Sequence, residues 1–382
     1  MYDVTLAPCA EYEAAACRAA LEAVLAPLGG LDWVTPGLRV GIKVNLVAAM
    51  KPETAATTHP VLLCELVKLL TARGAEVIVG DSPGGLFTAP FVEHVYHVCG
   101  LEAVEACGGR LNRDFSTVEI EYPAARAAKI FTATAWLRDC DAIINFCKLK
   151  SHGMMGLSCA AKNLFGTIPG TRKPEYHFRF PDYAQFADML LDLDDYWAPR
   201  LHICDAVLAM EGNGPTAGTP RPMGLVLAAE NPHRLDLLAA ALVGLAPKDV
   251  PTLEAAKRRG YLPDSVEDLR VSADWRPYVC PDFERIEERS SLQFGGRGRL
   301  VSAFLRRCLE ARPEADVSCI GCAKCAQVCP AKAIEMKNRR PKIDRSRCIR
   351  CFCCQEFCPK GAMQVKRPLA ARLVSTGKRR KT

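Results

Sequence analysis

Eight of the twenty cysteines in this chain stand in two successive runs of the form C-x2-C-x2-C-x3-C-P. From Cys319 to Cys348 the offset is 29 positions, and every cysteine of the first run recurs at that offset in the second. The eight residues are Cys319, Cys322, Cys325, Cys329, Cys348, Cys351, Cys354 and Cys358. An internal repeat of metal-ligand spacing rarely arises by chance, so this repeat constrains the C-terminal fold more than any other feature does.

The spacing is that of ligands to iron–sulfur cubes. A [4Fe–4S] cube takes four thiolates, and in two-cluster ferredoxins the last cysteine of each run ligates the other cluster. We therefore expect two [4Fe–4S] clusters, held by two ligand sets. Set I consists of Cys319, Cys322, Cys325 and Cys358, and set II consists of Cys348, Cys351, Cys354 and Cys329. Zinc ribbons typically use two CxxC pairs, and disulfide frameworks are typical of secreted chains, so these alternatives fit less well.

Cys353 lies inside the second run but joins neither set at ligand spacing. We interpret it as a non-ligand, with a rescue or sensor role as the alternative. Over about 50 residues, the segment 313–366 resembles a bacterial-type 2[4Fe–4S] ferredoxin domain. The resemblance implies a small C-terminal α+β domain, electron transfer, and a soluble electron donor or acceptor protein as partner.

The rest of the 382-residue chain is long enough for a large domain with its own core. The chain is 49% hydrophobic and 24% charged, which is typical of globular proteins. No run of about 18 apolar residues predicts a membrane span, and the first residues lack the pattern of a secretory signal. We expect a cytoplasmic location, in which the cysteines outside the two sets are reduced core residues.

Charge and composition suggest where the parts of the chain divide. The net charge is +7, and part of it comes from a cluster of lysines and arginines at 378–381. Because no aromatic residues interleave with these basic residues, a nucleic-acid partner is not expected. We expect an α/β domain at 1–290, a linker at 291–312, the ferredoxin-type domain at 313–366 and a basic tail at 367–382.

Short apolar runs alternate with helical patterns through the first 290 residues. The predicted buried strands are 38–46, 76–80, 142–146, 201–204 and 224–229, with an edge or hairpin strand at 115–122. The predicted helices are 11–28, 60–73, 89–107, 157–166, 182–196 and 235–243. Thr58 is the expected N-cap of the second helix. Such alternation predicts an α/β fold with a mostly parallel sheet and helices on both faces.

Polar residues follow four of the predicted strands. Because ligands bind at the carboxyl ends of strands in open α/β sheets, we expect these side chains to converge on one pocket. The predicted catalytic residues are Asp81, Lys148, Lys150, His152 and Asp205. The predicted cofactor-binding residues are Lys43, Asn45, Lys162, Asn163, Glu211 and Asn213. Taken singly, each also has a structural explanation, such as helix capping for the aspartates or a tight turn for Asn213.

The predicted pocket is cationic, since six basic side chains outnumber three carboxylates. The basic residues are Lys43, Lys148, Lys150, His152, Lys162 and Arg172, and the acidic ones are Asp81, Asp205 and Glu211. Lysines beside helix N-termini favour an anionic small molecule such as a carboxylate or phosphate. The GDSPGG loop is neither GxGxxG nor a P-loop, so a nucleotide is not indicated. A Ser82–His152–Asp205 hydrolase would need a nucleophile elbow, which the sequence lacks.

The same residues stand in long motifs that resemble the DUF362 family of iron–sulfur-associated proteins. The motifs are KVNLV, TTHP, VIVGDSPGG, KLKSHGMMGLSCAAKNLFGTIPG and DAVLAMEGNGP, and they cover about residues 38–240. The resemblance marks as motif positions Lys43, Asn45, His59, Asp81, Lys148, Lys150, His152, Lys162, Asn163, Asp205, Glu211 and Asn213. It implies a DUF362-like α/β domain accompanied by a ferredoxin-type module, and it carries over no catalytic residue.

Two hypotheses follow from a ferredoxin module fused to a polar pocket. In the first, the chain is an oxidoreductase that passes low-potential electrons to an anionic small molecule or cofactor, and His152 or a lysine protonates the product. In the second, it is a non-enzymatic electron carrier or a metal or cofactor maturation factor, whose large domain docks a partner protein.

Overall fold

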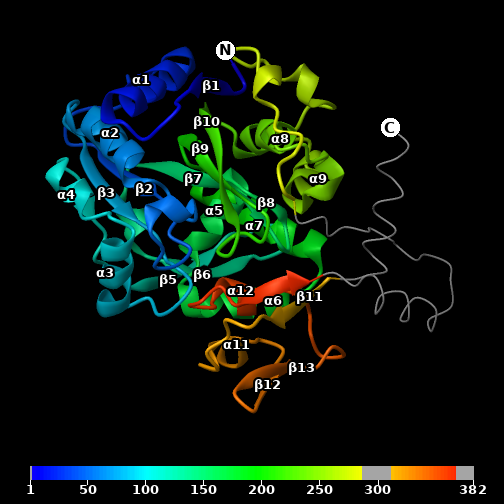
Figure 1. The fold of residues 1–382 in the computed structure, drawn as a ribbon. Coiled ribbons are helices and arrows are strands. Elements are labelled where there is room, and N and C mark those ends of the chain that lie inside the picture. Colours follow the sequence, from blue (N-terminus) through cyan, green and yellow to red (C-terminus); the bar gives the residue numbers. More distant parts are fainter. Residues whose placement is uncertain (1, 286–310, 367–382) are drawn as a thin grey trace.

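The computed structural model of the protein describes residues 2–285 and 311–366 (Figure 1). The predicted basic tail at 367–382 lies outside the described residues, as does the predicted linker at 291–312 except for its last two residues. Within the described ranges, no helix combines the length and the apolar character that a membrane crossing requires.

A mixed eight-stranded sheet forms the centre of the N-terminal domain. Its strands are β1 (Thr5–Pro8), β2 (Arg39–Lys43), β3 (Glu76–Gly80), β4 (Arg110–Leu111), β7 (Ala142–His152), β8 (Gly156–Ser158), β9 (Leu201–Glu211) and β10 (Thr219–Ala229). They follow the order β1-β10-β9-β7-β2-β3-β4, and β8 pairs with β7. The pairs from β9 to β4 are parallel, whereas β10 is antiparallel to β9 and to β1. The prediction of a mostly parallel sheet is confirmed.

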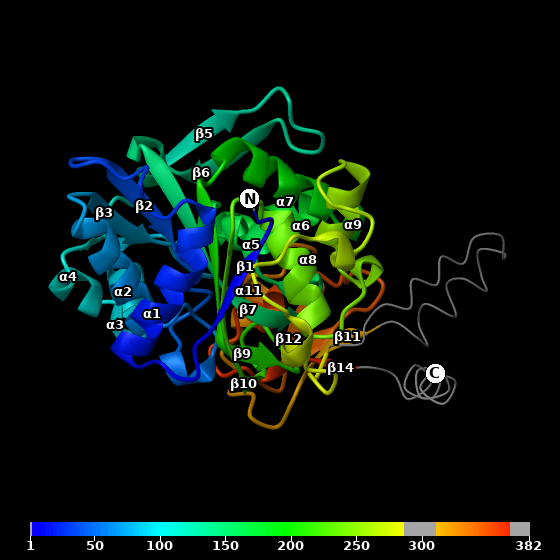
Figure 2. The ribbon, with the colours of Figure 1, turned by 90° about the horizontal axis from the view of Figure 1, so that it is seen from above.

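Helices cover both faces of this sheet, as predicted (Figure 2). One side carries α1 (Ala14–Leu25), α2 (Pro60–Thr71), α3 (Ala89–Val98) and α4 (Ala103–Ala106). The other carries α5 (Ala160–Asn163), α6 (Lys173–Arg179), α7 (Tyr183–Trp197), α8 (Pro232–Leu242) and α9 (Pro251–Arg258). Separate apolar cores form under the two layers, because each helix buries its apolar stripe against the sheet.

Several element boundaries differ from those predicted. The predicted helix 89–107 is two helices, since Gly100 takes a φ of 71° and ends the first one. His59 rather than Thr58 caps α2, and its ring Nδ1 accepts a hydrogen bond from Val61 N–H. A hairpin of β5 (Thr117–Glu121) and β6 (Ile130–Thr134) confirms the strand predicted at 115–122.

Strands β7 and β9 each extend to eleven residues, well beyond the apolar runs that predicted them. Polar residues such as Lys148, Lys150 and Asp205 continue both strands, because their side chains find buried partners instead of solvent. Asp205 therefore lies inside β9 rather than after it. The predicted helix 157–166 is correspondingly shorter, since β8 occupies its first residues and only α5 is α-helical.

The C-terminal domain repeats one small α+β unit, as predicted. Strand β11 (Arg312–Ala315) pairs with β14 (Met363–Lys366), and β12 (Ile334–Lys337) pairs with β13 (Arg340–Ile343). The short helices are α11 (Lys324–Gln327) and α12 (Cys353–Glu356), and each is preceded by a left-handed residue, Ala323 or Phe352. In Figure 1, α12 and β11 lie against the α/β domain, whereas α11 and the β12–β13 hairpin project away from it.

Candidate functional site

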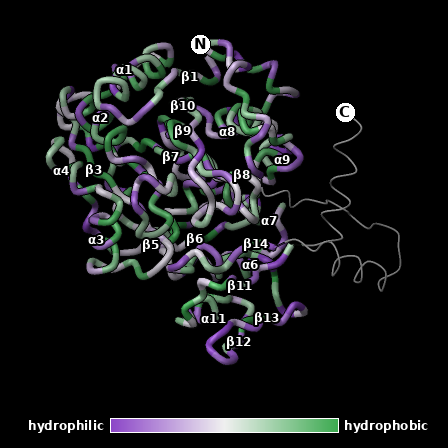
Figure 3. Tube along the Cα trace, viewed as in Figure 1, coloured by the Kyte–Doolittle hydropathy of each residue, from purple (hydrophilic) through white to green (hydrophobic). Residues whose placement is uncertain are grey.

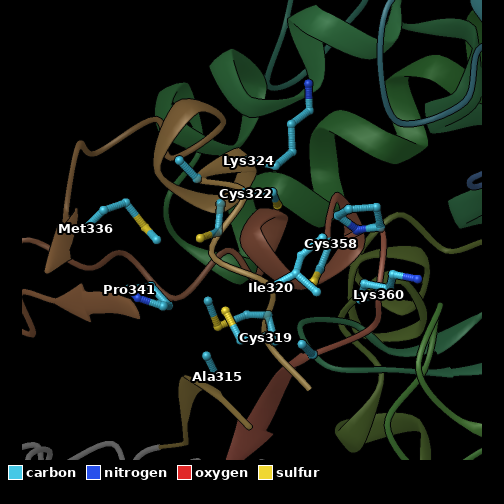
Figure 4. Close-up of a pocket in the computed structure, with 14 residues that line it drawn as sticks. Ala315, Cys319, Ile320, Cys322, Lys324, Met336, Pro341, Cys358 and Lys360 are labelled. Atoms are coloured by element: carbon cyan, nitrogen blue, oxygen red, sulfur yellow. The ribbon is translucent and has the colours of Figure 1, made fainter. Parts of the chain in front are cut away.

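The four thiols of set I meet around one pocket of the C-terminal domain (Figure 4). Cys325 comes from α11, Cys319 and Cys322 come from the loop before it, and Cys358 comes from the end of the other run. Burial, and then the neighbouring charges of the other three thiols, raise the pKa of Cys325. The chain therefore brings together the four sulfurs that the spacing assigns to one cluster.

The thiols of set II also gather, although they come from both runs. Burial raises the pKa of Cys354, and the charges of Cys351, Cys348, Cys325 and Cys329 add to this effect. Burial also raises the pKa of Cys348, and there the thiols whose charges add to the effect are Cys351 and Cys329, both of set II. Cys351 and Cys354 are buried beside α12, and Cys348 and Cys329 are half-buried. The crossing of one cysteine from each run into the other set is thus present in the fold.

The spacing of these sulfurs fits cubes better than single metal ions. A tetrahedral zinc ion with Zn–S bonds of about 2.3 Å holds its sulfurs only about 3.8 Å apart. In the described part of the chain, no three of the eight thiols lie within 4.8 Å of one another. A cube with one thiolate on each of four irons needs a wider arrangement. Cys353 is buried beside Cys351 and Phe357, and it does not line the pocket of set I.

Three cysteines of the α/β domain form a different cluster. The sulfurs of Cys147 on β7, Cys204 on β9 and Cys159 before α5 lie within 4.8 Å of one another. Burial raises the pKa of Cys147 and of Cys159. Burial acts in the same direction on Cys204, but hydrogen bonds with the other two thiols lower its pKa to about 6. The three thiols satisfy one another inside an apolar core, in keeping with their interpretation as core residues.

A buried ion pair closes the carboxyl ends of β2 and β3. Lys43 Nζ lies 2.8 Å from Asp81 Oδ1, and both side chains are almost fully buried. The Asp81 carboxylate also accepts the backbone N–H groups of Leu46 and Ser82, each at 2.7 Å. Gly166 passes so close to this pair that an added Cβ would collide with both side chains. Backbone and side-chain partners therefore fix the orientation of Asp81.

A chain of amides links this ion pair to Lys150 on β7. Asn163 Oδ1 accepts a hydrogen bond from Asn45 Nδ2 at 2.9 Å, and Asn45 Oδ1 accepts one from Lys150 Nζ at 2.8 Å. Lys150 Nζ also donates to the Ala56 carbonyl at 2.7 Å. Burial, and then the charge of Lys162, lower the pKa of Lys150 to about 7. Five predicted residues from three strand ends and α5 are thus contiguous: Lys43, Asn45, Asp81, Lys150 and Asn163.

A second group surrounds Asp205 further back along the sheet. Lys148 Nζ lies 2.9 Å from Asp205 Oδ2, and neither side chain is exposed. Tyr12 Oη donates to Asp205 Oδ1 at 2.7 Å, accepts from Lys148 Nζ at 2.6 Å, and its ring stacks on His59. Asp205 Oδ2 also accepts a hydrogen bond from the His59 N–H at 3.0 Å, and this bond fixes the start of α2. Lys148 and Asp205 therefore satisfy each other, which is typical of a structural pair.

Lys162 has no such partner. Its side chain is 9% exposed, and no other residue in 2–285 or 311–366 gives its ammonium a hydrogen bond or an ion pair. It lies 5.0 Å from the centre of the Phe165 ring. The charge of Lys162 lowers the pKa of Lys150, His152 and Lys173, in each case after burial as a cause. Lys150, His152 and Lys173 therefore all lie close enough to Lys162 to sense its charge.

One carboxylate of the C-terminal domain enters this cationic cluster. Glu356 on α12 places Oε1 3.0 Å from Nε2 of His152. His152 Nδ1 accepts the backbone N–H groups of Met154 and Met155, so the proton of the neutral ring lies on Nε2. Burial alone would raise the pKa of Glu356, but Lys162 and the neighbouring His152 hold that pKa below its usual range. Glu356 therefore stays ionised inside the interface.

Further contacts fix the two domains against each other. Gln355 Nε2 donates to the Asn213 carbonyl at 2.9 Å, and Asn213 Oδ1 accepts Val365 N–H at 3.2 Å. Phe352 joins the apolar core under α7, and Phe357 packs beside Gly84 of the GDSPGG loop. Asn213 is therefore an interface residue, which the interpretation of its turn as a cofactor-binding position did not anticipate.

Two residues predicted in the pocket lie apart from it. Glu211 accepts Glu284 N–H at 2.8 Å on the far end of β9. Arg172 is exposed and pairs with Glu175, whereas the next residue, Lys173, is buried and donates to the Ser82 carbonyl. Glu356, Lys173 and His177 complete the cluster and were not predicted. None of the three follows a predicted strand, so the pattern that identified the other residues carried no signal for them.

Two thiol sets with the spacing of cube ligands make this an iron–sulfur protein of the two-cluster ferredoxin type. The larger α/β domain is assigned to a family by its sequence. The chain belongs to the DUF362 family, since residues 40–241 match the family described as a domain of unknown function (DUF362). Residues 318–362 match the 4Fe-4S dicluster domain. Both resemblances drawn from the sequence are thereby confirmed.

Individual relatives show how far the similarity extends. The thylakoid-associated protein sll1697 of Synechocystis sp. is 33% identical over 309 residues, which make up 79% of this chain and 93% of that protein. The lactate racemase apoprotein from Thermoanaerobacterium thermosaccharolyticum has a TM-score of 0.38 and 11% identity, over 62% of this chain and 56% of that one. A Thermotoga maritima protein has a TM-score of 0.35 and 14% identity, over 55% and 53% of the two chains.

Proposed function

We propose that this protein is an iron–sulfur oxidoreductase that delivers low-potential electrons to an anionic small molecule or cofactor held in the α/β domain. Set I and set II would each hold one [4Fe–4S] cluster, and such clusters supply single electrons when bound. The contact between Glu356 and His152 carries the proposal. It joins the helix that bears Cys354 of set II to the buried lysines of the α/β domain.

The charge balance of the cluster supports an anionic ligand. Four buried lysines, Lys43, Lys150, Lys162 and Lys173, face only two carboxylates, those of Asp81 and Glu356. A buried charge without a partner is costly, so a bound anion would stabilise this arrangement. Lys162 is the residue placed to bind it, since no hydrogen bond or ion pair within the described residues holds its ammonium, which lies over the Phe165 ring. Both ring nitrogens of the buried His177 also lack hydrogen-bond partners there.

Lys150 is the proposed proton donor to the reduced product. A general acid works best when its pKa lies near the working pH, and the pKa of Lys150 is about 7. The pKa of His152 is lowered to about 4, first by burial, so this ring is neutral at pH 7, and its Nε2 lies 3.0 Å from Glu356 Oε1. His152 would therefore orient Glu356 rather than supply a proton.

Anion binding is expected to weaken as the pH rises from about 6 to about 9. Burial lowers the pKa of Lys150 to about 7 and that of Lys173 to about 8, so both ammonium groups lose their protons within this range. An anion prefers the protonated cluster and should raise both pKa values when it binds. Sulfate is a suitable probe for titration calorimetry, because its charge stays constant. A flat or rising affinity would contradict the assignment.

Replacing Lys162 with glutamine is expected to remove most of any anionic compound that co-purifies with the protein. The loss of one charge-assisted contact corresponds to about a 10- to 100-fold weaker affinity. Mass spectrometry of the small molecules released by denaturation would measure the bound amount per chain, with iron content as the check on the clusters. Lys248→Gln provides the control, since Lys248 lies in an exposed turn far along the chain.

The outcome of this comparison separates the two hypotheses for the whole protein. A compound released from the native protein and from Lys248→Gln, but not from Lys162→Gln, would support the oxidoreductase. Full iron content without any released anion, and without electron transfer to candidate acceptors, would instead favour an electron carrier or maturation factor.

A further inference from the structure

The two thiol sets face different surroundings. Cys351 and Cys354 of set II are buried near α12, whose flanking side chains Phe352 and Phe357 pack on the α/β domain. Set I lies near α11, on the part that projects away from that domain in Figure 1, and its Cys322 is exposed. A redox partner from solution can therefore approach set I more closely than set II.

Two large apolar side chains are exposed on the loop that carries set I. Val317 is 92% exposed and Ile320 is 50% exposed, on either side of Cys319. Ile320 lines the same pocket as Cys322, as Figure 4 shows. Single exposed apolar residues are common on protein surfaces and by themselves indicate nothing. Val317 and Ile320 differ from such isolated residues because they lie beside an exposed cluster ligand, where a redox partner would make contact.

Positive charge surrounds this loop. Lys324 and Lys360 line the pocket with Ile320, and the guanidinium groups of Arg339 and Arg340 donate to backbone carbonyls of the same loop. We call Val317, Ile320, Lys324, Arg339, Arg340 and Lys360 the set I face. Between Arg312 and Lys366 there are twelve lysines and arginines but only five aspartates and glutamates, of which Glu356 is buried. The adjoining β12–β13 hairpin is largely hydrophilic (Figure 3).

We propose that the set I face docks a small, acidic, single-electron carrier protein, so that electrons enter at set I and leave at set II. This inference rests on the proposed electron-transfer function and adds the entry point and the partner's charge. In the step at this face, the reduced carrier is oxidised by one electron, which passes to the cluster of set I, and no bond is made or broken. Complementary charge would steer the carrier, and Ile320 would seat it.

An acidic protein fits this face better than an anionic membrane does. Peripheral membrane helices bury a continuous apolar side, whereas this loop offers two exposed apolar side chains near a redox centre. A wider hollow adjoins the set I face at Val317 and Arg340 and continues past Arg345 and Arg347, with both basic and acidic residues in its lining, to Cys348 of set II. That hollow is the competing docking surface, so its charges need a test of their own.

Binding of an acidic ferredoxin to the intact, cluster-loaded protein tests the inference. Ile320→Glu adds a negative charge to the face and is expected to weaken the affinity by about tenfold or more, measured by titration calorimetry. Ile130→Glu is the matched control, because Ile130 is 45% exposed on β6 of the α/β domain. Affinity for the unchanged protein should also fall as salt screens the charges.

Several results would overturn the docking assignment. These are equal affinities for Ile320→Glu and Ile130→Glu, a larger loss from Arg345→Glu with Arg347→Glu, or binding to phosphatidylserine vesicles in place of the ferredoxin. Iron content and reduction by dithionite should be the same in all variants, which excludes damage to the clusters. Intact ferredoxin binding without reduction of any acceptor would leave the docking face standing and refute the oxidoreductase.

Discussion

Replacing Cys354 with alanine is expected to lower the iron content from about eight to about four atoms per chain, whereas the same change at its neighbour Cys353 should leave it unchanged. Cys354 lies among the thiols of set II, and a cube that loses one of its four ligands is no longer held. Cys353 is also buried, but it does not line the pocket of set I and takes no ligand position in the repeat.

Iron and sulfide analysis of anaerobically purified protein measures this difference directly. Electron paramagnetic resonance of the reduced protein adds a second readout, since the magnetic interaction between two reduced clusters should disappear in Cys354→Ala. Unchanged iron in Cys354→Ala would refute the assignment of set II. An equal loss of iron in Cys353→Ala would mean that the second run uses its cysteines in another way.

Replacing Asp81 with alanine is expected to destabilise the α/β domain by about 3–5 kcal/mol. The change leaves the buried ammonium of Lys43 without its counter-ion and removes the acceptor for two backbone N–H groups. Burial already lowers the pKa of Lys43, so the folded state tolerates this charge only because Asp81 is present. For a domain of this size, the loss corresponds to a fall in melting temperature on the order of 10 °C.

Thermal unfolding followed by circular dichroism would measure the effect. Asp139→Ala is the matched control, because Asp139 is exposed and should change stability by less than about 0.5 kcal/mol. The double variant Lys43→Met with Asp81→Ala should be more stable than Asp81→Ala alone, since it removes the unpaired charge. A double variant as unstable as the sum of the two single variants would show that the two residues act independently.

The C-terminal domain could be predicted almost completely because its determinants are local. Ligand spacing fixes which residues share a loop, and the 29-residue repeat reappears in the backbone as the left-handed residues Ala323 and Phe352. The α/β alternation likewise predicted the sheet and its two helical layers. The predicted strands are too short, because the prediction places strand ends at polar residues. Lys148 and Asp205 instead continue their strands, since each is the buried partner of the other.

Burial of individual charges could not be predicted in the same way. Arg172 and Lys173 are adjacent in the sequence, yet only Lys173 faces the cluster, since α6 begins there and sets its direction. Glu356 depends on the packing of one domain against another, which no local pattern encodes. Position after a predicted strand therefore predicts most of the lysines and amides of the cluster but not the carboxylate of Glu356.

The two halves of the ferredoxin-type repeat differ in the residues that precede the last cysteine of each run. At the 29-residue offset, Gln355, Glu356 and Phe357 correspond to Ala326, Gln327 and Val328. These three residues, which contact the α/β domain, therefore occupy the interval between two cluster ligands, where a ferredoxin of separate origin has no reason to carry them. A grafted ferredoxin would bring working clusters but not this contact. The electron-carrying part of this chain is consequently an inseparable component rather than a replaceable module.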